Sequence, residues 1–216
     1  MAGGRHLRGV ALFFLVLFAG CAPARKAYLA GSFHSPNLIA VLPINNWSTD
    51  LDAPEPVRQA LASELEFKGY RVAPFAEMDE KLNENGFTDG GQLGALDGVK
   101  LAELLGVDGL LYSELLQFTQ INLAFYLERR VEIAARLIDG KSGEKLWSDQ
   151  QKRSTVIMVT DRKSAERVFA KGMAVRWMEK AIRRPLEPEI EMTVDALFDS
   201  LPFNHFQGFY SKEVVP

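Results

Sequence analysis

The sequence predicts a layered α/β domain with a mixed sheet, in which parallel strand–helix units are followed by an antiparallel hairpin and C-terminal helices. Residues 38–44 form a short, nearly continuous apolar run, which is typical of a strand buried on both faces. Helical patterns alternate with strand patterns as far as residue 120, and this favours helices layered on a sheet. From Arg130 the apolar residues recur at every second position, which favours an antiparallel hairpin.

The first half of the chain is expected to alternate strands with helices. The run 38–44 predicts the first central strand of the sheet. A helix is expected between Asp52, which can serve as its N-cap, and Gly69, which can end it. Residues 70–75 then predict a second strand, so this part of the chain reads as a strand–helix–strand unit.

Glycine and aspartate residues divide the next part of the chain. Residues 76–85 predict a short helix that stops at Gly86, and a glycine-rich loop is expected after it. Asp97 can cap a further helix, which Gly106 ends, and residues 108–120 predict a long strand. The glycines of the expected loop are Gly90, Gly91 and Gly94.

The second half predicts a hairpin followed by two helices. Apolar and charged residues alternate over 130–137, residues 139–143 have turn composition, and residues 144–154 are expected to run back as the partner strand. The apolar spacing then predicts a longer helix over 161–185 and a second amphipathic helix between residues 188 and 202. The sheet is therefore expected to be mixed.

The N-terminal segment has the features of a bacterial lipoprotein signal. Arg5 and Arg8 precede an apolar stretch over residues 10–19, which is about half the roughly 20 residues that a membrane-spanning helix needs. The stretch leads to Cys21, the only cysteine of the chain. The end of this stretch resembles a lipobox, with Phe18 in place of the usual Leu. The resemblance implies that the Cys21 thiol receives a diacylglyceryl group and that the leader is cut before it. Acyl chains such as palmitate would then hold the protein at a membrane.

This signal divides the chain into four expected parts. Residues 1–20 are the signal peptide, residues 21–36 a lipidated tether, residues 37–202 the α/β domain with its C-terminal helices, and residues 203–216 an aromatic tail. Ala22 after the cysteine resembles an outer-membrane sorting signal. In a cell with two membranes, we therefore expect the protein to be anchored in the outer membrane and to face the periplasm.

The charge balance argues against nucleic acid as a partner. The formal net charge is −3, and it becomes −5 once a leader containing Arg5 and Arg8 is removed. An acidic chain of this kind, in which no cluster of Lys and Arg stands out, lacks the electrostatic footprint of nucleic-acid binding. Contact with the membrane is accordingly expected to go through the lipid.

The residue types that carry common catalytic chemistry are scarce. After the leader, the chain contains two histidines, His34 in the expected tether and His205 in the tail. Glycine-rich stretches do not match a phosphate-binding motif, and neighbouring carboxylates fall on faces expected to be exposed. The sequence therefore predicts no catalytic residue, no metal site and no cofactor, and a protein that is not an enzyme.

Two aromatic features are candidate contacts with a protein partner. Trp47 follows the first expected strand, at the end of a strand where α/β sheets place their ligands. The tail is rich in aromatic residues, which either fold back on the domain or dock a partner or a second copy, because exposed apolar patches mark interaction sites. The aromatic residues of the tail are Phe203, Phe206, Phe209 and Tyr210.

Several motifs together resemble a family of bacterial lipoproteins of unknown function that includes a neisserial surface antigen. Besides the lipobox, the resemblance runs over residues 38–155. It implies a domain similar to the amino-terminal domain of TolB, to the curli secretion lipoprotein and to a lipoprotein that activates a peptidoglycan synthase, all of them assembly or adaptor modules. The family brings no established catalytic residue. The motifs are Ile39-Ala40-Val41-Leu42-Pro43, Gly69-Tyr70-Arg71-Val72, Leu105-Gly106-Val107-Asp108 and Ser142-Gly143-Glu144-Lys145-Leu146-Trp147.

These observations predict a lipid-anchored envelope lipoprotein that acts as a non-enzymatic adaptor or assembly factor by binding other envelope proteins. The first alternative is a subunit of an oligomeric secretion or export complex, with contacts through Met173 and Trp177 or through the aromatic tail. The second is a periplasmic hydrolase with a site near Trp47 and Asp50, which would need carboxylates that converge in a cleft.

Overall fold

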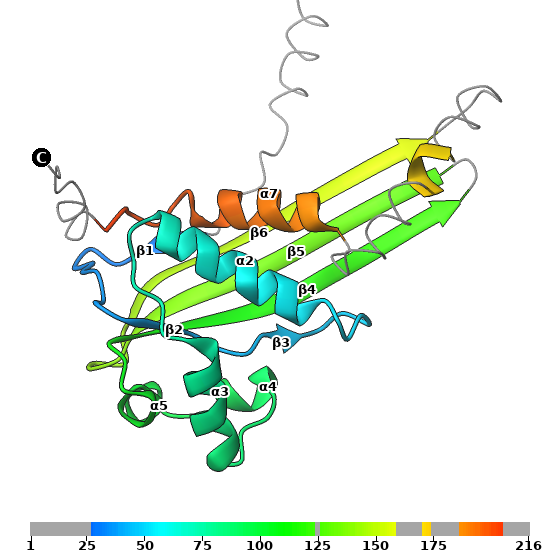
Figure 1. Cartoon of the computed structure of the whole chain (residues 1–216). Coiled ribbons are helices and arrows are strands. Elements are labelled where there is room, and N and C mark those ends of the chain that lie inside the picture. The colour runs from blue at the N-terminus through cyan, green and yellow to red at the C-terminus, as the bar shows by residue number, and fades with distance from the viewer. Residues whose placement is uncertain (1–26, 124–125, 159–169, 174–185, 205–216) are drawn as a thin grey trace, which may run out of the picture.

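The computed structural model describes residues 27–123, 126–158, 170–173 and 186–204. A mixed sheet of six strands with helices on both faces forms the fold, as the sequence predicts (Figure 1). Along the sheet the strand order is β1-β6-β5-β4-β2, and β3 pairs with β4 beyond the end of β2. In the described ranges, no helix combines the length and apolar character that crossing a membrane requires.

Three long antiparallel strands form the body of the sheet, and two of them, β5 and β6, are the hairpin that the alternation after residue 130 predicts. The short strands β2 and β3 run parallel to β4, whereas β1 pairs antiparallel with β6. The tether expected over residues 21–36 thus contributes two residues to the sheet. The strands are β1 Tyr28–Leu29, β2 Ile39–Val41, β3 Asn45–Asn46, β4 Gly109–Leu123, β5 Tyr126–Asp139 and β6 Lys145–Met158.

Helices cover both faces of the sheet. Alternate residues of β2 point to opposite sides, and because they are apolar on both sides, each face needs a covering layer. Ile39 and Val41 contact the core beneath α2 and α7, whereas Ala40 belongs to the core beneath α3, α4 and α5. In Figure 1, α2 and α7 lie across the long strands, and the three smaller helices gather near β2. The helices are α2 Pro54–Phe67, α3 Phe75–Glu84, α4 Gly90–Leu93, α5 Gly98–Leu105 and α7 Glu187–Phe198.

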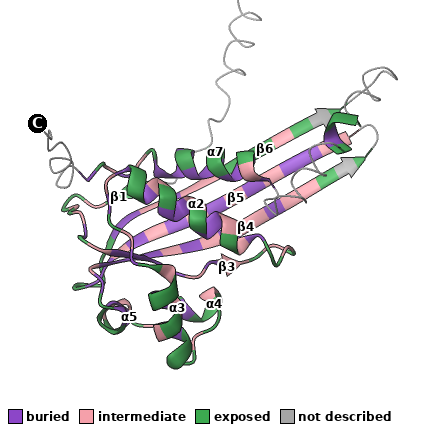
Figure 2. Ribbon diagram, viewed as in Figure 1, coloured by how far each residue is buried: buried purple, intermediate pink, exposed green. Residues whose placement is uncertain are grey.

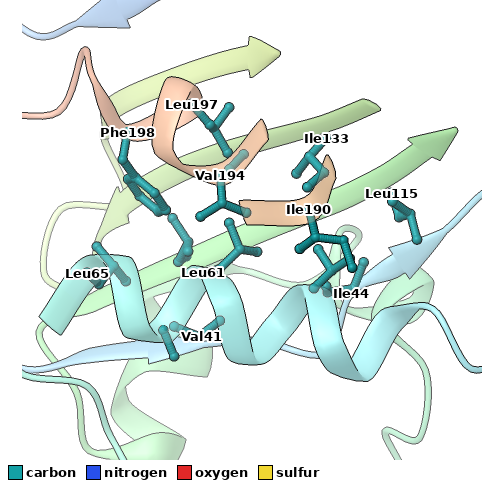
Figure 3. Packing of buried hydrophobic residues seen from close by; sticks show 14 of the residues in the cluster. Val41, Ile44, Leu61, Leu65, Leu115, Ile133, Ile190, Val194, Leu197 and Phe198 are labelled. Atoms are coloured by element: carbon teal, nitrogen blue, oxygen red, sulfur yellow. The ribbon is translucent and has the colours of Figure 1, made fainter. Parts of the chain in front are cut away.

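The larger core joins α2 and α7 to the sheet. Apolar residues of both helices converge on β4 and β5, where most of them are fully buried (Figure 3). Burial of one such side chain contributes about 1.5–3 kcal/mol. Phe198 of α7 also stacks on the buried ring of Trp147, with 5.3 Å between the ring centroids. The residues of this core that Figure 3 labels are Val41, Ile44, Leu61, Leu65, Leu115, Ile133, Ile190, Val194, Leu197 and Phe198.

Two expected strand features differ in the structure. The first strand, expected to be central, is β2 at the end of the strand order, and it is buried on both faces because helices cover it from both sides. The second strand, expected over residues 70–75, is reduced to a single bridge between Val72 and Ile39. Tyr70 is instead held by the C-terminal part of the chain, since its hydroxyl donates a hydrogen bond to the carbonyl oxygen of Pro202 at 2.7 Å.

The helix ends agree with the sequence except at the start of α2. Gly69, Gly86 and Gly106 all have positive φ after a helix, and the Asp97 carboxylate accepts from the Val99 amide. At the start of α2, however, Asp50 rather than Asp52 accepts hydrogen bonds from the backbone. Asp50 can do so because its side chain reaches the amides of residues 52 and 53 from the preceding loop.

The glycine-rich loop expected after Gly86 contains the short helix α4 instead. Asp89 and Gln92 form a capping box, which satisfies the first amides of this turn. Gly90 lies against the backbone of Pro43 and Ile44, where a Cβ atom would come within 2.6 Å of the Ile44 carbonyl oxygen. The absence of a side chain at position 90 therefore allows α4 to begin directly against the segment between β2 and β3.

The predicted helix over 161–185 lies mostly outside the described residues. Residues 170–173 are helical, as that expectation requires. The second amphipathic helix, expected between residues 188 and 202, is confirmed as α7. The hairpin turn is also confirmed, with the Asp139 carboxylate accepting from the amide and the hydroxyl of Ser142.

We predict that Gly90→Ala destabilises the fold by about 1–3 kcal/mol, because the new methyl group overlaps backbone atoms that cannot move independently. Urea unfolding followed by tryptophan fluorescence measures the change. Gly31→Ala is the matched control, since a Cβ atom there meets nothing within 4 Å, and it should change the free energy of unfolding by less than about 0.5 kcal/mol. Equal effects of the two substitutions would contradict the close approach of α4.

Candidate interaction surface

A hydrogen-bonded loop after β3 holds two large apolar side chains in solvent. The Asn46 side chain accepts from the amide and hydroxyl of Ser48 and donates to the carbonyl oxygen of Asp50. Asp50 in turn accepts from the two amides that precede α2. Between these anchors, Trp47 is 66% exposed and Leu51 is 88% exposed. We call residues 47–51 the Trp47 loop.

This arrangement explains why an apolar pair stays outside the core. The side-chain bonds of Asn46, Ser48 and Asp50 hold the loop backbone in the conformation in which Trp47 is exposed. Trp is enriched among the residues that dominate protein interfaces, and a preformed loop loses little conformational entropy on binding. Trp47 is therefore exposed at the surface, where the partner contact predicted from the sequence would form.

An exposed aromatic pair lies at the opposite end of α2. Phe67 is 74% exposed and meets Phe203 edge to face, with 6.3 Å between the ring centroids. The Lys68 ammonium lies 4.3 Å from the centroid of the Phe203 ring, and the amide of Asn204 donates to the Lys68 carbonyl oxygen. The start of the tail therefore folds back on the domain, while Phe203 remains 48% exposed.

The other predicted site residues cannot be placed. Cys21, Phe206, Phe209 and Tyr210 lie outside the described residues, so their roles stay predictions. His34 is largely exposed, and its hydrogen bond to Asp139 raises the pKa of the imidazole. Across the described ranges, no group of three His, Cys, Asp or Glu side chains is placed to hold a metal ion.

A groove of about 960 Å³ runs between α2 and α7. Among the residues that the structure describes, its lining consists of acidic and apolar residues from both helices and two neutral polar residues of α2, with no lysine or arginine. Figure 2 shows that the outer sides of α2 and α7 carry exposed residues, whereas the strands beneath them are largely buried. We call it the α2/α7 groove; its lining is Glu55, Pro56, Gln59, Ala60, Ser63, Glu64, Phe67, Glu187, Ile190, Glu191, Met192, Val194 and Asp195.

The groove places like charges close together. Partial burial raises the pKa of Glu64, and the negative charge of Asp195 on α7 raises it further. Lys68, one turn along α2, acts in the opposite direction but does not cancel the rise. The ionised form of Glu64 is therefore disfavoured in the folded protein, and a cation placed in the groove would relieve this strain.

Sequence reasoning missed the groove, Leu51 and Phe67. The groove needs α2 and α7 side by side, and more than one hundred residues separate these helices along the chain. Phe67, by contrast, could have been found, because it falls off the helical stripe formed by Val57, Leu61 and Leu65. A large aromatic residue on the polar side of a helix indicates an exposed contact.

We predict that Glu64→Gln raises the free energy of unfolding at pH 7 by a few tenths of a kcal/mol, since it removes the repulsion from Asp195. Because the pKa of Glu64 is raised in the folded state, the wild type loses stability as the pH rises through that pKa. The free energies of unfolding of the wild type and of Glu64→Gln should therefore become equal near pH 3.5, where Glu64 is protonated. Urea unfolding at both pH values measures this, with Glu66→Gln on the exposed side of α2 as control. A lower stability of Glu64→Gln at pH 7 would contradict it.

Comparisons with known proteins support the lipoprotein prediction. A protein of Neisseria meningitidis serogroup B described as "Putative lipoprotein NMB1124/NMB1162" is 31% identical over 113 residues. This alignment covers 52% of the chain and 53% of that protein, so the chain spans about half the length of the curated relative it matches. The crystal structure of lipoprotein GNA1162 from Neisseria meningitidis is 26% identical, with a TM-score of 0.53, and covers 68% of this chain and 99% of its own.

A more distant solved structure shares the fold. The PelC dodecamer from Paraburkholderia phytofirmans has 13% sequence identity and a TM-score of 0.50, and it covers 83% of this chain and 98% of its own. The family model described as "Putative lipoprotein GNA1162-like" matches residues 27–176, which is more than half of the chain. The chain therefore belongs to the GNA1162-like family of lipoproteins.

Proposed function

We propose that this lipoprotein is a lipid-anchored, non-enzymatic adaptor that binds another protein of the cell envelope through the Trp47 loop. The observation that carries the proposal is the exposure of Trp47 and Leu51 on a loop fixed by the side chains of Asn46 and Asp50. Burying two such side chains at an interface contributes several kcal/mol, at about 25 cal/mol for each Å² of apolar surface. Residues 203–210 are a second proposed contact.

The proposed anchor fits the geometry of the domain. In this proposal residues 1–20 are the signal peptide, Cys21 carries the lipid, and the domain faces the periplasm from the outer membrane. Tyr28 already pairs with β6, so at about 3.3 Å per residue the chain from Cys21 to the sheet spans at most roughly 25 Å. The adaptor would therefore work close to the membrane surface, where its partner would also have to lie.

The hydrolase alternative has no support at its expected site. Its candidate carboxylate, Asp50, accepts hydrogen bonds from the amides of Asp52 and Ala53 at 3.0 and 3.1 Å. That carboxylate therefore holds the start of α2 in place, and we assign it this structural role.

The second candidate function is a subunit of an oligomeric secretion or export complex. PelC, which shares the fold, forms a dodecamer, and this likeness is one of fold. The specific observation that favours the candidate is the α2/α7 groove, an open surface whose charge calls for a basic partner. Self-association and adaptor function are compatible, because the Trp47 loop does not line the groove.

We predict that a photoreactive amino acid in place of Leu51 crosslinks the full, lipidated chain to a discrete envelope protein in cells. Trp47→Ala in the same chain should reduce this adduct by roughly 30-fold, because truncation of an interface tryptophan typically costs about 2 kcal/mol or more. Immunoblotting and mass spectrometry of the adduct measure the loss.

The matched control places the same photoreactive residue at Glu80, on the exposed side of α3 and away from the Trp47 loop. This position should give no such adduct. The adaptor proposal fails if position 51 yields no adduct, or if the adduct is as abundant with Trp47→Ala as without it.

A further inference from the structure

We propose that the α2/α7 groove of one copy binds residues 161–184 of a second copy of this chain. The inference goes beyond the adaptor function, because it concerns a surface that the Trp47 loop does not line. It rests on the charge and shape of the groove, on the composition of the segment, and on the position of the part of the segment that the structure describes.

The groove is suited to an amphipathic helix. Along α2 it extends from Glu55 to Phe67, nearly the whole helix, which at 1.5 Å per residue is about 20 Å. Its apolar residues include Met192, which is 48% exposed, and Phe67 at one end. Acidic residues alternate with these apolar positions on both walls, so a helix with an apolar stripe and basic flanks matches the groove in both respects.

Repulsion within the groove favours a basic occupant. Glu64 faces the charge of Asp195, and the pKa of Glu64 is raised as a result of burial and of this charge. Glu191 and Asp195 are exposed on the other wall. A lysine or arginine between the walls would form charge-assisted hydrogen bonds with these carboxylates and remove the repulsion.

The chain itself contains a segment of this chemistry. Residues 161–184 carry eight Lys and Arg against three Asp and Glu, a net charge of +5 in a chain whose total is −3. The expectation that the chain lacks a cluster of basic residues is therefore wrong for this segment. The sequence predicts a helix here, with the apolar stripe Ala165, Val168, Phe169, Gly172, Met173, Trp177 and Ala181.

The described part of this segment lies away from the groove of its own copy. Residues 170–173 form a helical turn beside the ends of β6 and β5, at the tip of the long strands, whereas α2 and α7 lie over the middle of the sheet (Figure 1). Lys171 and Met173 are exposed there. Since this turn lies at the tip of the strands, away from the groove of its own copy, we take the groove of a neighbouring copy as the site that the segment occupies.

Such a contact is heterologous, since the tip of one copy meets the middle of the next. Repeated contacts of this kind close into a ring when the rotation between copies allows it, and otherwise form an open filament. Each copy would thereby bury the apolar lining of its groove, and each would present its own Trp47 loop unchanged.

Zero-length carbodiimide coupling tests this contact in the full, detergent-solubilised chain. A mixture of ¹⁴N-labelled and ¹⁵N-labelled protein is coupled, and the joined peptides are identified by mass spectrometry. We expect peptides that join Lys171 or Lys180 to Glu191 or Asp195 and that combine the two labels. Joined peptides that always carry a single label, or the absence of groove peptides from the coupled products, would overturn the proposal.

Charge reversal supplies the specific control. Glu191→Lys with Asp195→Lys should weaken self-association at least about tenfold, and so should Lys171→Glu with Lys180→Glu; mixing the two variants should restore it. Glu80→Lys with Glu84→Lys on α3 changes the net charge equally and should have no effect. Failure of the mixture to restore association, or an equal loss with the α3 control, would overturn the proposal, and sedimentation measures each case.

The two proposals can fail separately. Trp47→Ala should leave self-association unchanged, because Trp47 does not line the groove. Reversal of the groove charges should leave the adduct from position 51 unchanged.

Discussion

The packing of α7 on the sheet is the constraint on which the rest of the structure depends. Phe198 stacks on the buried ring of Trp147, whose indole nitrogen donates to Ser200 just after the helix. At the other end of α7, the buried Glu189 carboxylate lies 2.9 Å from the Arg129 guanidinium of β5. The stack supplies apolar burial, and the ion pair fixes the register of the helix, because removing one partner of a buried pair typically costs about 3–5 kcal/mol.

The α2/α7 groove and the exposed pair of Phe67 and Phe203 both depend on the position of α7. The second wall of the groove is α7 itself, and without it α2 would present a single acidic face. The segment after α7 passes the end of α2, where Pro202 accepts from Tyr70 and Phe203 meets Phe67. Burial raises the pKa of Tyr70 to about 12, so its hydroxyl remains a donor at any physiological pH. The packing of α7 on the sheet therefore creates both the groove and the exposed aromatic pair.

The sequence predicted the fold class and most helix ends because these depend on local signals. Positive-φ glycines at 69, 86 and 106 and the cap at Asp97 act within a few residues, and alternation identifies the hairpin without any knowledge of its neighbours. The strand expected over residues 70–75 failed because its pairing depends on β2, which offers room for a single bridge at Val72. Trp47 could be singled out from its place after a strand, but the groove depends on two helices that only the fold brings together.

The basic segment was overlooked for a similar reason, because the net charge of the chain is a sum over all residues and does not show local charge. A net charge of −3 averages an acidic domain with residues 161–184, and the average hides a local charge of +5. Folding then gathers acidic side chains from α2 and α7 into one groove, where the charge of Asp195 adds to the effect of burial and raises the pKa of Glu64. Repulsion between the acidic groups of the groove lowers the stability of the monomer. Binding of the basic segment in the groove would remove this repulsion. In the assembly that we propose, the groove of one copy and the basic segment of the next form the two halves of one contact.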